Sequence, residues 1–113
     1  MGQLAQTFKA LADPTRLRIL NLLPTAPGSV CELQAVLGLP QPLISRHFAY
    51  LRNAELVDDE RHGVRVLYRL RTEGPAGDKL RLFLGSVLPL DERLRKKADA
   101  WRSFRARGSR MSA

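Results

Sequence analysis

The side chains best suited to recognising another molecule are grouped at the start of the segment 41–53. Gln41 and Arg46 each carry a planar group that can form two hydrogen bonds with a base edge, Gln with adenine and Arg with guanine. Ser45 can bond to a base or a phosphate, and Leu43 can contact a thymine methyl group. We expect this group to read bases in the major groove of double-stranded DNA, which is binding rather than catalysis.

A predicted helix positions these side chains. Within residues 41–53, apolar side chains recur at helical spacing and predict a buried stripe of Ile44, Phe48 and Leu51. At 100° per residue, Arg46 lies about 200° from Ile44 and faces away from the core, with Pro42 beside it. His47 lies about 60° from the centre of the stripe, so contact with DNA and a half-buried, hydrogen-bonded position are both open.

A short helix and a turn precede this segment. Ser29 and Glu32 form a capping-box pattern that begins a helix of about two turns. Gly38 is suited to end that helix, because glycine adopts the left-handed conformation without steric cost. Two helices joined by a brief turn, the second with an outward arginine, predict a helix-turn-helix.

A β-hairpin is predicted directly after these helices. Residues 64–70 alternate in the manner of a half-buried strand, with Val64 on the buried side, and residues 56–60 would pair with them. The sequence Arg61-His62-Gly63 fits a three-residue loop, which would place Arg61 and His62 at the tip. Together with Arg65, these two side chains are expected to meet backbone phosphates or the minor groove.

Most of the remaining chain has helical patterning. Helices are predicted over residues 4–12 and 14–23, a loop over 74–77, and a long helix over 78–106 that is broken or kinked at Pro89 and frays at its basic end. We expect Trp101 and Phe104 to pack in a dimer rather than to line an effector pocket. The fold class is therefore mainly α with a β-hairpin, a winged helix-turn-helix that dimerises through its first and last helices, residues 4–12 and 78 to about 87.

Composition narrows the class of function. The 113 residues, 44% of them hydrophobic, fit one domain, assigned to residues 1–106, with a basic tail at 107–113 that we expect to be disordered. The net charge of +8 favours a nucleic-acid partner. An enzyme is disfavoured by an inventory of two His, one Cys and no phosphate-binding glycine motif. The carboxylates at 58–60 are expected to form an exposed strand edge.

Other partners and locations are less well supported by the composition. The longest nearly apolar stretch, residues 82–90, is about half of what spans a bilayer, so we expect a cytoplasmic protein with no membrane partner. An aromatic content of 6% disfavours an RNA reader, which would display aromatic side chains for stacking. A protein-docking module that uses the same surface stays open.

Three blocks, in this order, resemble the ArsR/SmtB family of winged helix-turn-helix repressors. They are residues 8–20 around Asp13-Pro14-Thr15-Arg16, residues 39–52 around Gln41-Pro42-Leu43-Ile44-Ser45-Arg46-His47, and residues 56–57 with 63–68. The resemblance covers about residues 4–70. It implies a homodimer that binds an operator with dyad symmetry and releases it when an effector binds, and it implies a DNA-reading role for Gln41 to His47.

The chain departs from the family pattern where effectors bind. Arsenic-sensing members have Cys-Val-Cys where this chain has Ser29-Val30-Cys31, and As(III) wants about three thiolates. The family's other site uses a His on the last helix, and residues 78–106 contain none, so we expect no metal and no other cofactor.

Cys31 is the effector candidate. It can act as a redox-sensitive thiol near a helix start or, in the preferred interpretation, serve as a small buried hydrophobe. The predicted function is an operator-binding repressor released by a metalloid or another inducer. The alternative is a thiol-redox-responsive or effector-independent regulator that uses the same DNA-binding surface.

Overall fold

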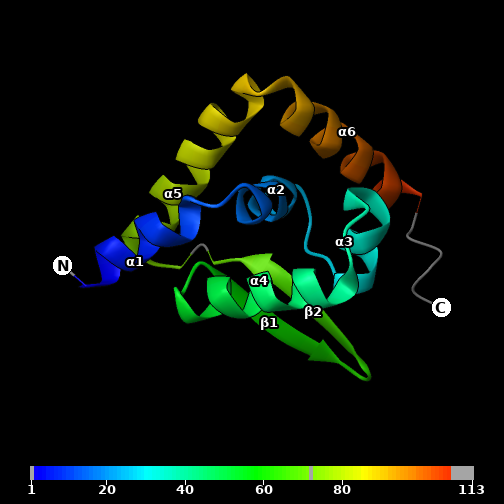
Figure 1. Ribbon diagram of the computed structural model, residues 1–113, viewed down its shortest axis with the longest axis horizontal. Coiled ribbons are helices and arrows are strands. Elements are labelled where there is room, and N and C mark those ends of the chain that lie inside the picture. The colour runs from blue at the N-terminus through cyan, green and yellow to red at the C-terminus, as the bar shows by residue number, and fades with distance from the viewer. Residues whose placement is uncertain (1, 72, 108–113) are drawn as a thin grey trace.

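The computed structural model describes residues 2–71 and 73–107, with residues 74–76 described by their backbone alone. Its elements confirm a mainly α fold with one β-hairpin (Figure 1). In chain order they are α1 (Gly2–Leu11), α2 (Pro14–Leu22), α3 (Val30–Leu37), α4 (Gln41–Asn53), β1 (Val57–His62), β2 (Arg65–Leu70), α5 (Gly74–Val87), the short 3-10 helix η1 (Leu88–Leu90) and α6 (Glu92–Ala106).

Local sequence signals set the helix boundaries as expected. Asp13 begins α2 by accepting hydrogen bonds from the amides of Thr15 and Arg16, at 2.8 and 3.0 Å. Ser29 begins α3 with a complete capping box, in which the side chains of Ser29 and Glu32 each accept from the other residue's backbone N–H. Gly38 ends α3 in the left-handed conformation at φ 69°.

Helix α2 lies at the centre of the molecule. In Figure 1, α5 and α6 meet at an apex and pass on either side of α2, while α4 and the hairpin lie below it. The core joins buried side chains from α2, α3, α4 and α6, which include Ile19, Leu20, Leu33, Ile44, Phe48, Leu51 and Trp101. Burial of this shared core fixes α4 and α6 on the same scaffold.

The loop predicted at residues 74–77 is wrong, since this segment is the first turn of α5. Proline is tolerated at the start of a helix because the amide that it lacks has no intrahelical partner there. Here Glu73 is the extended N-cap residue, and Pro75 lies within the first two helical positions. The Gly-Pro pattern therefore marks a helix start rather than an interruption.

The expected break at Pro89 is confirmed, and residues 92–106 of the segment that was predicted to fray form the helix α6. The chain turns through η1, and α6 then packs against α2 and α3 of its own subunit. Trp101 is 0% exposed, and its indole N–H donates to the carbonyl oxygen of Ala26 at 3.2 Å. Trp101 thus belongs to the subunit core and not to a dimer contact, and residues 108–113 of the predicted tail lie outside the described residues.

The sequence was expected to contain no segment that spans a membrane. No helix within the described part of the chain is both long and apolar enough to cross a bilayer.

Candidate nucleic-acid interface

Helices α3 and α4 form the predicted helix-turn-helix. The residues Gly38, Leu39 and Pro40 connect them, and the amide of Gly38 donates to the carbonyl oxygen of Gln34 at 2.8 Å. Pro40 is the N-cap residue of α4 and provides no side-chain hydrogen bond to the free amides at the helix start. The amides of Leu43 and Ile44 donate to the carbonyl oxygen of Pro40, and Pro42 has no amide hydrogen. Only the Gln41 amide at the start of α4 could therefore donate to a DNA phosphate.

One face of α4 holds it in the protein, and the opposite face is open. The predicted stripe of Ile44, Phe48 and Leu51 is fully buried. On the other side, Gln41, Pro42, Ser45 and Arg46 are exposed, and Leu43 is half-buried. No described residue forms a hydrogen bond or ion pair with the Arg46 side chain. The helix thus carries an available guanidinium at the position that the sequence predicted.

His47 points inward, as the half-buried interpretation had it. Its Nδ1 lies 3.4 Å from Nη1 of Arg16, whose guanidinium also lies 4.0 Å from the centre of the Tyr50 ring. Desolvation lowers the pKa of His47; Asp13 opposes this, while Arg16 and Arg46 lower the pKa further. His47 therefore favours the neutral form and joins α4 to the start of α2.

Asp13 is the acidic member of this group. Burial raises the pKa of its carboxyl, but the Arg16 amide hydrogen bond and the positive Arg16 outweigh that, with smaller contributions from His47 and Thr15. The pKa of Asp13 is consequently lowered, so the cap at the start of α2 is held in its charged form.

The hairpin loop is shorter than predicted. Strands β1 and β2 pair up to His62 opposite Arg65, so that only Gly63 and Val64 form the loop. Gly63 has φ 64°, and glycine as the first of two loop residues is the pattern of a type II′ turn. Arg61 and His62 are therefore exposed strand residues rather than the tip.

Val64 was expected on the buried side of the strand, and this was wrong. It lies at the tip of the hairpin and is 97% exposed. Had the glycine been read as opening a two-residue loop, the sequence alone would have placed an apolar side chain at the tip. Of the predicted hairpin contacts, the His62 ring pairs with the Glu60 carboxylate, and Arg65 pairs with the buried Glu32 at 3.1 Å.

Stacked rings attach the hairpin to α4. The Phe48 and Tyr68 rings lie 3.9 Å apart at 10° to one another. The backbone of Tyr68 also exchanges two hydrogen bonds with Gly28, in the segment that leads into α3. The hairpin is thereby fixed beside the helix-turn-helix in the position of a wing.

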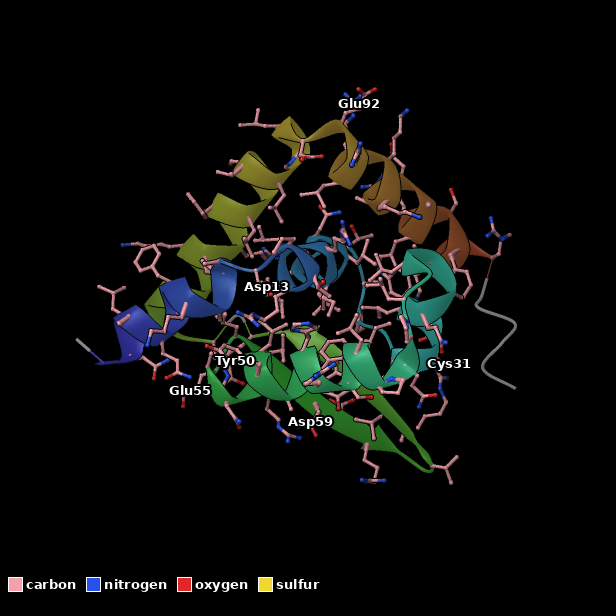
Figure 2. All side chains as sticks on the ribbon, viewed as in Figure 1. Asp13, Cys31, Tyr50, Glu55, Asp59 and Glu92 are labelled. Atoms are coloured by element: carbon pink, nitrogen blue, oxygen red, sulfur yellow. The ribbon has the colours of Figure 1, made fainter. Side chains whose placement is uncertain are left out.

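Cys31 is exposed, which corrects the preferred interpretation of a buried hydrophobe. It is the second residue of α3 and lies on the side of that helix away from α2 (Figure 2). Its capping neighbours Ser29 and Glu32 face inward instead. Among the described residues, no group of three or more His, Cys, Asp or Glu side chains could hold a metal ion.

Comparisons with known proteins agree with this geometry. Residues 13–59 match the family described as bacterial regulatory protein, arsR family. The arsenic resistance transcriptional regulator ArsR1 of Pseudomonas putida is 51% identical over 70 residues, which are 60% of this chain and 54% of that protein. The transcriptional repressor SdpR of Bacillus subtilis is 37% identical over 65 residues, which are 58% of this chain and 72% of SdpR. The match thus spans about half the length of ArsR1.

A solved structure shares the architecture. The homodimeric winged helix-turn-helix DNA-binding domain of Mb0332 from Mycobacterium bovis, described as a possible ArsR-family transcriptional regulator, superposes with a TM-score of 0.67 at 30% identity. The match covers 76% of this chain and 78% of that domain. The chain therefore belongs to the arsR family of bacterial regulatory proteins and has a winged helix-turn-helix fold.

Proposed function

We propose that this chain represses transcription by binding a specific operator in double-stranded DNA. The observation that carries the proposal is Arg46, an exposed guanidinium on a helix whose opposite face is fully buried. An arginine in this position can make two hydrogen bonds to guanine when α4 enters the major groove. Gln41 and Ser45 are exposed near Arg46 and complete a base-reading surface, while Leu43 is half-buried. The name of the relative SdpR supports repression as the outcome.

The wing is the second part of the proposed interface. Arg61 and His62 lie exposed near its end, and Arg61 suits contacts with phosphates or the minor groove. The His62 ring pairs with the Glu60 carboxylate, so it is less suited to such a contact. The net charge of +8 adds a general attraction to DNA. Arg65 is less suited to such a contact, because its guanidinium already faces the Glu32 carboxylate.

We also propose that two copies associate through α1 and α5. Large apolar side chains are exposed on these helices, among them Leu4, Phe8, Leu82 and Phe83. A groove of about 810 Å³ lies between α1 and α5, and a second copy would cover it. These two helices correspond to residues 4–12 and 78 to about 87, the segments that were expected to pair, and α6 does not line the groove.

The dimer geometry would place the two reading helices. The side chain of Gln3 in α1 donates to the carbonyl oxygen of Ala54 at the end of α4, at 3.1 Å. Pairing of α1 with its twin therefore fixes the spacing of the two α4 helices, which a dyad-symmetric operator requires to be about 34 to 36 Å. The Mb0332 domain is homodimeric, which supports the association of two copies.

In this proposal the chain binds DNA without catalysing a reaction and without a resident cofactor. We place it in the cytoplasm, where it would reach the operator. Release by an effector stays a prediction from the family resemblance. A metalloid site of about three thiolates needs more thiols than the single cysteine of each chain supplies, so no effector is assigned.

The test begins with a duplex selected by the chain from a random DNA pool. We expect the affinity to fall steeply with salt, because bound phosphates release counterions. Arg46→Ala should weaken binding to the selected duplex by roughly 5- to 150-fold, which corresponds to about 1–3 kcal/mol, and relax the preference at one base position.

The matched control is Arg102→Ala on α6. It also removes one positive charge, but from a side chain that pairs with Asp99 in its own helix. We expect its affinity to stay within about twofold of the wild type. Equal losses for both variants would show that DNA is held by charge alone, and the absence of any selected sequence would contradict a repressor and favour a protein-docking module.

A further inference from the structure

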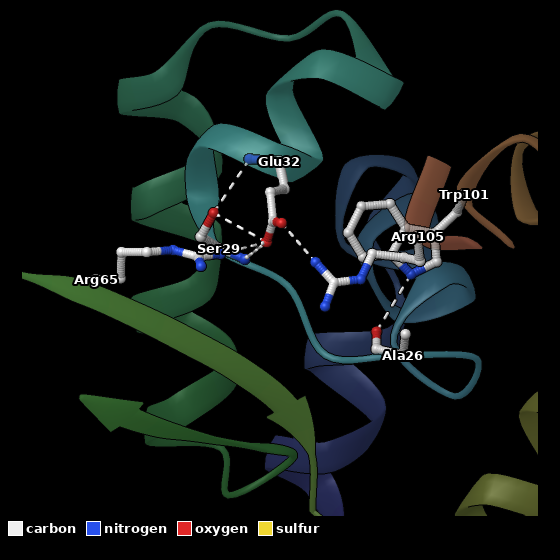
Figure 3. A network of polar contacts seen from close by, with 6 residues as sticks. All are labelled: Ala26, Ser29, Glu32, Arg65, Trp101 and Arg105. Carbon is white, nitrogen blue, oxygen red and sulfur yellow. Dashed lines mark hydrogen bonds and ion pairs between the residues drawn. The ribbon is translucent and has the colours of Figure 1, made fainter. Parts of the chain in front are cut away.

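One buried carboxylate connects three parts of the molecule that are far apart in the sequence. The Glu32 side chain on α3 is only 2% exposed. Its Oε1 lies 3.1 Å from Nη2 of Arg65 on β2, and its Oε2 lies 2.5 Å from Nη1 of Arg105 near the end of α6 (Figure 3). The same Oε1 accepts a hydrogen bond from the backbone N–H of Ser29 at 3.0 Å.

Such a carboxylate restrains the groups around it. A buried charge is costly unless opposite charges and hydrogen bonds compensate it. Here Arg65 on β2 and Arg105 on α6 provide opposite charges. Moving either arginine away from Glu32 would leave the buried carboxylate less compensated, which would cost free energy. The hairpin and α6 are therefore both held to the start of α3.

The backbone links the same elements at the same place. Gly28 and Tyr68 exchange two hydrogen bonds, at 2.8 and 3.0 Å, which attach β2 to the segment before α3. Trp101 of α6 covers this segment: its indole N–H bonds to Ala26, and two of its ring atoms would lie 2.6 and 2.7 Å from a Cβ atom at Gly28. The Trp101 side chain thus packs directly on Gly28, the residue whose backbone is hydrogen-bonded to the wing.

We propose that Glu32 is a positioning residue for the DNA interface, which fixes the wing through Arg65 and makes the position of the wing depend on α6 through Arg105. This inference rests on the proposed function. Arg65 then contributes to DNA binding by orienting the hairpin, rather than by contacting DNA itself. Both arginines lie outside residues 13–59, which match the family.

The first experiment needs no DNA. Glu32→Gln keeps the size of the side chain and an oxygen for the cap but removes the charge. We expect the amide of Tyr68, which bonds to Gly28, to exchange its hydrogen about tenfold faster in this variant. Trp101 is the only tryptophan of the chain, so its fluorescence reports whether α6 stays in place. Asp99→Asn is the matched control, because it neutralises an exposed carboxylate on α6.

The second experiment uses the duplex selected by the wild type and hydroxyl-radical footprinting. Glu32→Gln should weaken binding about tenfold and lose protection at the outer edges, where a wing lies, while the central protection by α4 persists. Arg105→Gln should act in the same direction, yet add little in the Glu32→Gln background, since both changes break one link. Should Glu32→Gln fail to fold, Arg105→Gln alone tests the link, because it leaves Glu32 with Arg65 and Ser29.

The outcomes separate this inference from the proposed function. A lower melting temperature with unchanged Tyr68 exchange and an intact footprint would mean that Glu32 serves stability alone, and would overturn the inference. If the wild type and its Arg46→Ala variant behave as proposed but Glu32→Gln keeps its outer protection, only the inference fails. A wild type that selects no duplex overturns both.

Discussion

Helices α4 and α6 have similar lengths, 13 and 15 residues, but a larger share of the basic side chains is paired on α6 than on α4, where Arg52 pairs with Asp59. On α4, Arg46 is exposed, and no described residue bonds to it. On α6, most of the basic side chains bind groups of their own chain: Arg95 and Lys96 pair with Glu92, Arg102 with Asp99 and Arg105 with Glu32. Residues 91–110 carry +5 of the net charge, but much of that charge is compensated within the chain, whereas Arg46 is available for the proposed contact with DNA.

The two helices also differ in how they are anchored. Three side chains of α4 are fully buried along one face, whereas the buried anchor of α6 is Trp101 alone, with Leu94 and Phe104 partly buried beside it. A helix held by one large ring depends on that ring more than a helix held by a stripe depends on any of its members.

The largest effect is expected from Trp101→Ala. The change would remove a fully buried ring and its hydrogen bond to Ala26, and should lower the free energy of unfolding by about 3–5 kcal/mol. Denaturation by urea, followed by circular dichroism, measures it. Arg46→Ala is the control on α4 and should change stability by no more than about 0.5 kcal/mol. A loss below 1 kcal/mol for Trp101→Ala would show that α6 is not part of the core.

The sequence predicted α4 correctly because the buried and exposed faces of this helix follow from the spacing of residues within it. Ile44, Phe48 and Leu51 recur at helical spacing, and the angle between Ile44 and Arg46 follows from helix geometry alone. The open question for His47 arose from the same geometry, since a side chain at the edge of the stripe can turn either way. The inward position of His47 involves a contact with Arg16, which lies 31 residues earlier in the sequence and which the helical pattern of residues 41–53 does not reveal.

The same reasoning failed for α6 and the wing because their positions depend on distant partners. Most of α6 is charged, so its periodicity is weak, and Trp101 becomes a core residue through α2 and α3. The capping-box pattern predicts the role of Glu32 at the start of α3, but it does not predict the ion pairs of Glu32 with Arg65 and Arg105. In the hairpin, the loop was predicted at residues 61–63 but lies at residues 63–64. Val64 is therefore at the tip and not on a strand face.

A middle-sized effect is expected where α6 packs on the chain before α3. A Cβ atom at Gly28 would lie 2.6 Å from both Leu33 and Trp101, so Gly28→Ala should destabilise the protein by about 1–3 kcal/mol. Gly85→Ala on α5 is the matched control, because a Cβ atom there meets nothing within 4 Å. It should be neutral or stabilising by up to about 1 kcal/mol, as alanine is favoured within a helix. Equal stability for the two variants would mean that α6 is packed loosely at Gly28.

The smallest effect concerns the inner edge of α4 and depends on pH. Because the pKa of His47 is lowered by desolvation and by its arginine neighbours, the unfolded chain takes up this proton at higher pH than the folded chain does. The stability that the neutral ring contributes is complete above the ordinary histidine pKa of about 6.5 and declines as the pH falls through that value. The lowered pKa of Asp13 causes a separate loss at more acidic pH, below its usual range. His47→Gln should therefore flatten the decline in urea-denaturation stability between about pH 7 and pH 5 and leave the acidic limb in place. An unchanged slope would assign the decline to other groups and would show that the His47 ring contributes no pH-dependent stability.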